Sequence, residues 1–63
     1  MNFAAWFRSA SISEADVRLE IWRLGARHRG WPLEGAREEL AQKDIASNRA
    51  DLLRACVRRL ENR

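Results

Sequence analysis

The chain is poor in cysteine, and this limits both its covalent structure and its expected compartment. Cys56 is the only cysteine among 63 residues, so no disulfide can form within one chain. A lone cysteine is typical of a protein kept in a reducing compartment. Cys56 also lies in an apolar stretch, where a cysteine is more often a small buried hydrophobic residue than a nucleophile. We therefore expect a cytoplasmic protein with an unreactive thiol.

Metal ligands and catalytic side chains are equally scarce. A structural zinc site needs four cysteine or histidine ligands, and a catalytic zinc site needs three protein ligands. His28 and Cys56 are each the only residue of their type. No strand precedes the three glycines and no Gly-Lys-Ser/Thr follows them, so they do not predict a phosphate-binding loop. The sequence predicts no cofactor, no metal, no small-molecule substrate and no enzymatic activity.

Long apolar runs are also absent. No stretch approaches the roughly 20 apolar residues that a membrane-spanning helix needs, and the first ten residues lack the pattern of a secretory signal. A chain of 63 residues is expected to form one small domain over residues 1–63. A domain of this size buries only about 60% of its unfolded surface, so we expect marginal stability as a monomer.

Arginine dominates the charges that are present. Lys43 is the only lysine among twelve basic residues, nine acidic residues are interleaved with them, and the net charge is +3. Arginine suits planar, bidentate contacts with phosphate or carboxylate, although codon bias in a GC-rich genome explains the same excess. Because the two signs are mixed along the chain, the sequence does not contain a basic tail.

The apolar spacing predicts an all-α fold, a compact bundle of three main helices with a short N-terminal helix. Asn2 is a candidate cap for the short helix. Ser13, followed by acidic residues, predicts the start of the next helix through a capping box, and Gly30 predicts its left-handed end. This second helix carries two apolar rows, and we expect neighbours to cover both. The first row is Val17, Ile21, Leu24 and His28. The second row is Ala15, Leu19, Trp22 and Ala26.

Two more helices complete the expected bundle. Pro32 suits the first turn of a helix that runs to about Gln42. Ser47 is a candidate cap for the last helix, whose apolar stripe includes Cys56. The third helix is expected to turn three glutamates toward water, namely Glu34, Glu38 and Glu39.

The loop that begins at Arg27 is the first candidate site. It combines cations, an aromatic side chain and the N-terminus of the third helix, which together can hold an anion or anchor a partner. The candidate residues are Arg27, His28, Arg29 and Trp31. Two structural interpretations compete with binding. Trp31 is expected to fold back as a hydrophobic staple, and His28 is expected to have a structural or capping role.

Residues 37–60 loosely resemble the helix-turn-helix of bacterial DNA-binding proteins. Ala41 and the run Ile45-Ala46-Ser47 match that motif, whereas its turn glycine is missing and Asp44 stands near its place. The resemblance implies that Asn48, Arg49 and Asp51 approach base edges and that Arg54 and Arg58 approach phosphates. The glutamates of the preceding helix oppose this interpretation, because they would repel the DNA backbone.

The third candidate site is the N-terminal aromatic trio Phe3, Trp6 and Phe7. These residues are expected to close the open side of the bundle or to dock on a partner, and a membrane surface is a further alternative.

Taken together, the sequence favours a small protein-interaction or regulatory module that binds another protein or itself. The alternative is a nucleic-acid-binding protein that uses residues 37–60.

Overall fold

The structure, a computed structural model, describes residues 12–62 and contains three helices in that range. They are α2 (Glu14–Arg27), α3 (Pro32–Leu40) and α4 (Ser47–Glu61). No strand occurs between residues 12 and 62, so the all-α prediction is confirmed there. The predicted N-terminal helix lies outside the described residues.

Local signals explain how α2 and α3 begin. The Ser13 hydroxyl accepts a hydrogen bond from the Asp16 N–H at 3.1 Å, and the Asp16 carboxylate accepts one from the Ser13 N–H at 3.3 Å. This reciprocal pair is the predicted capping box. Pro32 occupies the first turn of α3, also as predicted. The predicted Ser47 cap is wrong by one residue, because Ala46 is the N-cap of α4 and offers no side-chain oxygen.

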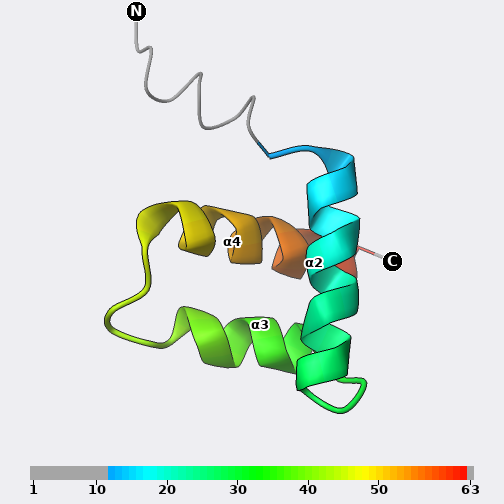
Figure 1. The fold of residues 1–63 in the computed structure, drawn as a ribbon, viewed down its shortest axis with the longest axis horizontal. Helices are drawn as coiled ribbons and strands as arrows, with labels where there is room; N and C mark the ends of the chain where they lie inside the picture. The colour runs from blue at the N-terminus through cyan, green and yellow to red at the C-terminus, as the bar shows by residue number, and fades with distance from the viewer. Residues whose placement is uncertain (1–11, 63) are drawn as a thin grey trace, which may run out of the picture.

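The hydrophobic core lies where the three helices meet. Each helix packs against the other two. Figure 1 shows α3 and α4 side by side and running in opposite directions, with α2 crossing both. The buried cluster comprises Val17, Leu24, Ala36, Leu53 and Cys56. Only the first of the two predicted apolar rows of α2 therefore enters the core.

The core is small and mostly aliphatic. Two surface ion pairs, Arg59 with Glu14 and Arg37 with Glu61, join α4 to α2 and to α3.

No helix within residues 12–62 has both the length and the apolar character that crossing a bilayer requires.

Candidate interaction surfaces

The loop between α2 and α3 is shaped by the way α2 ends. The Gly30 N–H donates to the Gly25 carbonyl at 2.7 Å, which is the long hydrogen bond of a Schellman motif. Arg29 and Gly30 have φ values of 58° and 86°. The positive φ expected of Gly30 is confirmed. The left-handed residue that ends α2 in this motif is however Arg29, one residue earlier than predicted, at a cost of about 1–2 kcal/mol for a residue with a Cβ atom.

The four candidate residues of this loop do not share one environment. Arg27 and His28 bind glutamates, whereas Arg29 is exposed. The expected staple by Trp31 is wrong, because its side chain is 66% exposed. Pro32 lies next to α2 at Gly25 instead. A depression of about 370 Å³ beside the loop is lined by these four residues together with Glu34, Gly35 and Glu38, so two further carboxylates face any anion there.

A cluster of hydrogen-bonded polar side chains joins all three helices beside this loop. Glu20 of α2 accepts hydrogen bonds from Arg49 of α4 at 2.6 Å and from Arg27 of α2 at 3.0 Å. Glu39 of α3 accepts from Arg49 at 3.0 Å and from Arg27 at 3.1 Å. His28 Nε2 lies 2.8 Å from the Glu39 carboxylate. These five residues form the ion cluster.

Burial makes the ion cluster an electrostatic unit. Glu20 is only 3% exposed, and every buried side-chain nitrogen or oxygen in the described part has a hydrogen-bond partner. Burial alone raises the pKa of Glu39, but hydrogen bonds from His28, Arg49 and Arg27 outweigh it and lower that pKa to about 2. Burial likewise raises the pKa of Glu20, and the two arginines outweigh it and leave that pKa below its ordinary value.

Neither carboxylate of this cluster was predicted from the sequence. Glu39 was expected to face water, and Glu20 belongs to neither of the two predicted apolar rows of α2. Glu20 is nevertheless buried, because it lies three residues after Val17 and four before Leu24 and so shares their buried face. This spacing is the signal that could have identified it. The arginine that neutralises it, Arg49, lies 29 residues away in the sequence.

Gly35 allows the close approach that orients His28. A Cβ atom placed on Gly35 would lie 2.3 Å from His28 Cδ2 and 2.5 Å from His28 Cγ. Only glycine therefore lets the imidazole lie against α3 and reach Glu39 one turn further along. The predicted structural role of His28 agrees with this geometry, and His28 is also the C-cap residue of α2.

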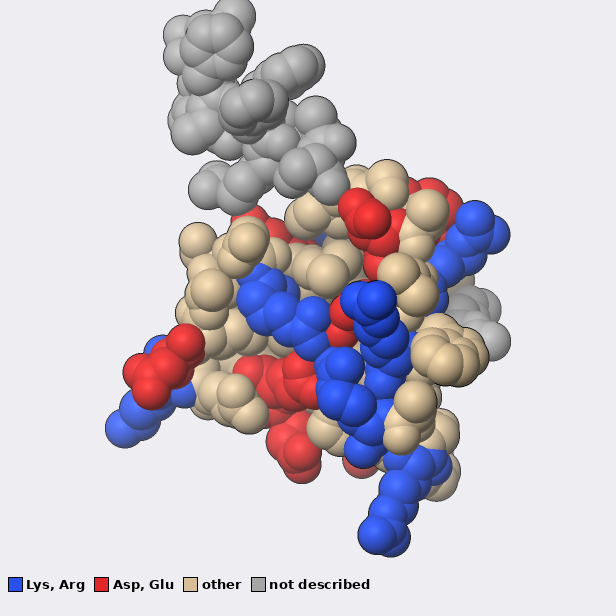
Figure 2. Space-filling model, viewed as in Figure 1, with Lys and Arg blue, Asp and Glu red and all other residues tan. Residues whose placement is uncertain are grey.

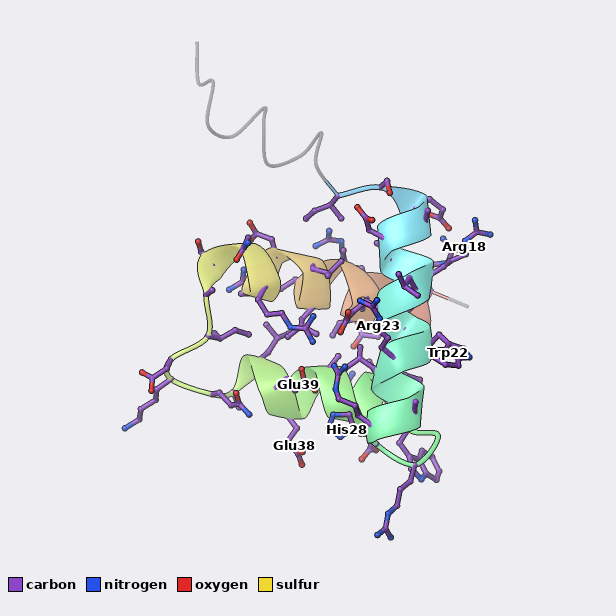
Figure 3. The ribbon with its side chains drawn as sticks, in the orientation of Figure 1. Arg18, Trp22, Arg23, His28, Glu38 and Glu39 are labelled. Carbon is purple, nitrogen blue, oxygen red and sulfur yellow. The ribbon has the colours of Figure 1, made fainter. Side chains whose placement is uncertain are left out.

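The outer face of α2 is an exposed apolar surface of the described part of the chain. It consists of the second predicted row, Ala15, Leu19, Trp22 and Ala26. The expectation that neighbouring elements cover this row is wrong, because Trp22 is 71% exposed and Leu19 is 48% exposed. The antiparallel helices α3 and α4 cover only one side of α2, which crosses them. Figure 3 shows Trp22 and Arg18 projecting outward from α2.

The candidate nucleic-acid residues of α4 point in different directions. Arg49 turns inward to the ion cluster. Arg54 is exposed and pairs with Asp51 at 3.2 Å. Arg58 faces a shallow depression of about 670 Å³ between α4 and the start of α2. Asn48 is exposed, and its side-chain oxygen accepts the Arg49 N–H at 2.8 Å.

Cys56 is fully buried as expected, with its Sγ 3.8 Å from the Val17 carbonyl oxygen. Burial raises the pKa of its thiol to about 11. No group of three potential metal ligands comes together among residues 12–62. The aromatic trio Phe3, Trp6 and Phe7 lies outside the described residues.

Comparisons of the chain with protein-family models, with curated proteins and with solved structures find no match.

Proposed function

We propose that this chain is a small, non-catalytic protein-interaction or regulatory module that binds a partner protein through the outer face of α2. One observation carries the proposal. An ordered helix keeps one apolar row in the core and presents the other, including a tryptophan that is 71% exposed, to solvent. Exposed apolar residues that occur singly need no explanation, whereas a contiguous row on a rigid element is typical of an interface. Tryptophan is also the residue type most enriched among interface hot spots.

The charge distribution supports a protein partner over a nucleic acid. Nucleic-acid-binding domains usually gather their cations on one face. Here Arg27 and Arg49 are neutralised by buried or half-buried carboxylates. Figure 2 shows basic and acidic side chains next to each other on the same face. Mixed charge around an apolar row suits a protein interface.

The arrangement of the helices argues in the same direction. The two helices of a helix-turn-helix cross at roughly 90–120°, whereas α3 and α4 lie antiparallel (Figure 1). The pair that crosses is α2 and α3, joined by the short loop that contains Gly30. In that pair α3 would take the place of the recognition helix, and it carries Glu34, Glu38 and Glu39. Nucleic-acid binding through residues 37–60 is therefore the less favoured of the two proposals.

Site-specific photocrosslinking tests the proposal directly. A photoreactive amino acid replaces Trp22 in the cells that make the protein, and the matched control carries it at the exposed Lys43. We expect one dominant protein adduct from position 22, lost when Leu19→Glu is added, and no such adduct from position 43. Equal adducts at both positions, or none at position 22, would contradict the proposal.

Titration with duplex DNA separates the two proposals. Tryptophan fluorescence is followed as generic duplex is added at low salt and again at higher salt. We expect no binding. Binding that falls steeply with salt would indicate several phosphate contacts and would favour the nucleic-acid alternative.

A further inference from the structure

The outer face of α2 has the spacing of a coiled-coil seam. Ala15, Leu19, Trp22 and Ala26 follow one another at intervals of four, three and four residues. In heptad notation they occupy positions d, a, d and a, which face a partner helix. Alanines at both ends of the row let another helix approach closely, and the two large side chains between them supply the apolar contact.

Two of the four positions that flank this seam are basic, and the other two are Asp16 and Gly25. Arg18 occupies a g position and Arg23 the following e position, and charges at e and g choose the partner of a coiled coil. Both arginines are exposed, and neither forms a salt bridge with any other residue in the described range 12–62. In the view of Figure 3, Arg18 projects from α2 on the same side as Trp22, and Arg23 lies on the other side. The acidic flanking residue, Asp16, belongs to the capping box of α2, so neither arginine has an acidic partner within the described residues.

A second copy of the chain satisfies these charges less well than an acidic helix does. In a parallel pair, a g residue meets the e residue five positions later on the partner, which places Arg18 opposite Arg23, and like charges that face each other are destabilising. In an antiparallel pair that aligns the same row, g meets g and e meets e, which places Arg18 opposite Gly25 and Arg23 opposite Asp16. Asp16 already accepts the Ser13 N–H in the capping box, and Arg18 gains no acidic partner.

We propose that the outer face of α2 binds an acidic amphipathic helix of another protein. The apolar stripe of that helix packs on Leu19 and Trp22, and its flanking carboxylates pair with Arg18 and Arg23. This inference rests on the proposed function and adds the chemistry of the partner. Arginine suits it because a guanidinium pairs with a carboxylate through two parallel hydrogen bonds.

Two dye-labelled synthetic peptides test the inference. Both are about 15–20 residues long, enough to form a helix, with the same leucines at a and d. One carries Glu at e and g, and the other carries Lys. Fluorescence anisotropy against the purified full chain should show the Glu peptide binding at least about tenfold more tightly than the Lys peptide. That binding should weaken as salt is raised.

Matched variants assign the binding to named residues. The double variant Arg18→Glu/Arg23→Glu should reverse the preference between the two peptides, whereas Arg58→Glu on α4 changes the net charge without doing so. Trp22→Ala should weaken binding of the Glu peptide by about tenfold or more, and the exposed Trp31→Ala should leave it unchanged. All these residues are exposed, so circular dichroism should confirm that each variant folds.

The outcomes that overturn the inference differ from those that overturn the proposed function. Equal binding of the two peptides, lost in Trp22→Ala, overturns the acidic partner and leaves apolar docking in place. If neither peptide binds, the acidic helix is overturned, and the crosslinking at position 22 decides the proposed function separately. A dimer in sedimentation velocity that Trp22→Ala dissociates overturns the acidic partner in favour of a second copy.

Discussion

Arg29 holds a left-handed backbone conformation that has a cost for any residue with a Cβ atom. Replacing it by glycine removes that strain and adds some freedom to the unfolded chain. We expect Arg29→Gly to raise the free energy of unfolding by about 0.5–1 kcal/mol, measured by urea denaturation followed by circular dichroism.

The matched substitution next to it should act in the opposite direction. Gly30→Ala should lower the free energy of unfolding by about 1 kcal/mol. The cause is the φ of 86°, because no atom lies within 4 Å of the added Cβ. A loss of stability in Arg29→Gly would show that the arginine side chain, and not its backbone, holds the loop.

Arg49 is the residue through which α4 enters the ion cluster. Arg49→Met leaves Glu20 with Arg27 as its only cation among the described residues and removes one of the three partners of Glu39. Because Glu20 is buried, we expect the free energy of unfolding to fall by about 2 kcal/mol. Urea denaturation measures this loss. The control is Arg54→Met, which breaks a pair on the surface and should cost less than about 0.5 kcal/mol. Equal losses of stability in Arg49→Met and Arg54→Met would contradict the expectation that burial makes the Arg49 ion pairs contribute more than a surface pair.

At the scale of the helix, the ends of the helices could be predicted from local sequence signals. The buried face of α2 could be predicted only in part. The capping box at Ser13, the first-turn Pro32 and the left-handed Gly30 depend on hydrogen bonds and backbone angles within a few residues. The exposure of Leu19 and Trp22 depends instead on how α3 and α4 are placed. Both rows of α2 are apolar, so periodicity alone does not say which one is covered.

The packing of α3 against the end of α2 depends on Gly35 and His28 as a pair. Gly35→Ala adds helix propensity worth about 1 kcal/mol, but it displaces the imidazole and so breaks its contact with Glu39. A hydrogen bond to a charged group contributes about 1.5–3 kcal/mol. We therefore expect Gly35→Ala to lower the free energy of unfolding by about 1 kcal/mol.

A double-mutant cycle isolates the contact. In the His28→Ala background, the same Gly35→Ala substitution should raise stability by about 1 kcal/mol, because only helix propensity remains. Gly25→Ala serves as a control, since its added Cβ would meet only Pro32 at 4.0 Å and should stabilise α2 in both backgrounds. The same sign for Gly35→Ala in both backgrounds would contradict the interpretation.

At the scale of the molecule, the ion cluster supplements a small core. Arg27 and His28 were predicted as anion-binding residues from their place in one loop, and the structure pairs them with Glu20 and Glu39. Those partners come from other turns and other helices, at separations that a local pattern does not show. The second apolar row of α2 was visible in the sequence. Its exposure to solvent follows from the packing of α3 and α4, which cover only the other row of that helix.

The paired carboxylates make stability depend on pH. A carboxyl group whose folded pKa is lowered contributes stability that is complete above its unfolded pKa and is lost as pH falls toward the folded pKa. With the pKa of Glu39 at about 2 and that of Glu20 also lowered, the loss should occur between about pH 5 and pH 2. Its size should be on the order of 3 kcal/mol, a large part of the stability of so small a domain.

Urea denaturation at constant ionic strength, repeated from pH 7 to pH 2, measures this dependence. The free energy of unfolding should be nearly constant above about pH 5 and fall steadily below it. Glu39→Gln should flatten the acid limb, since the glutamine does not titrate, at the cost of lower stability near pH 7. Glu34→Gln, on the exposed side of α3, should leave the slope of that limb unchanged. An unaltered slope in Glu39→Gln would mean that carboxylates other than Glu39 drive acid unfolding.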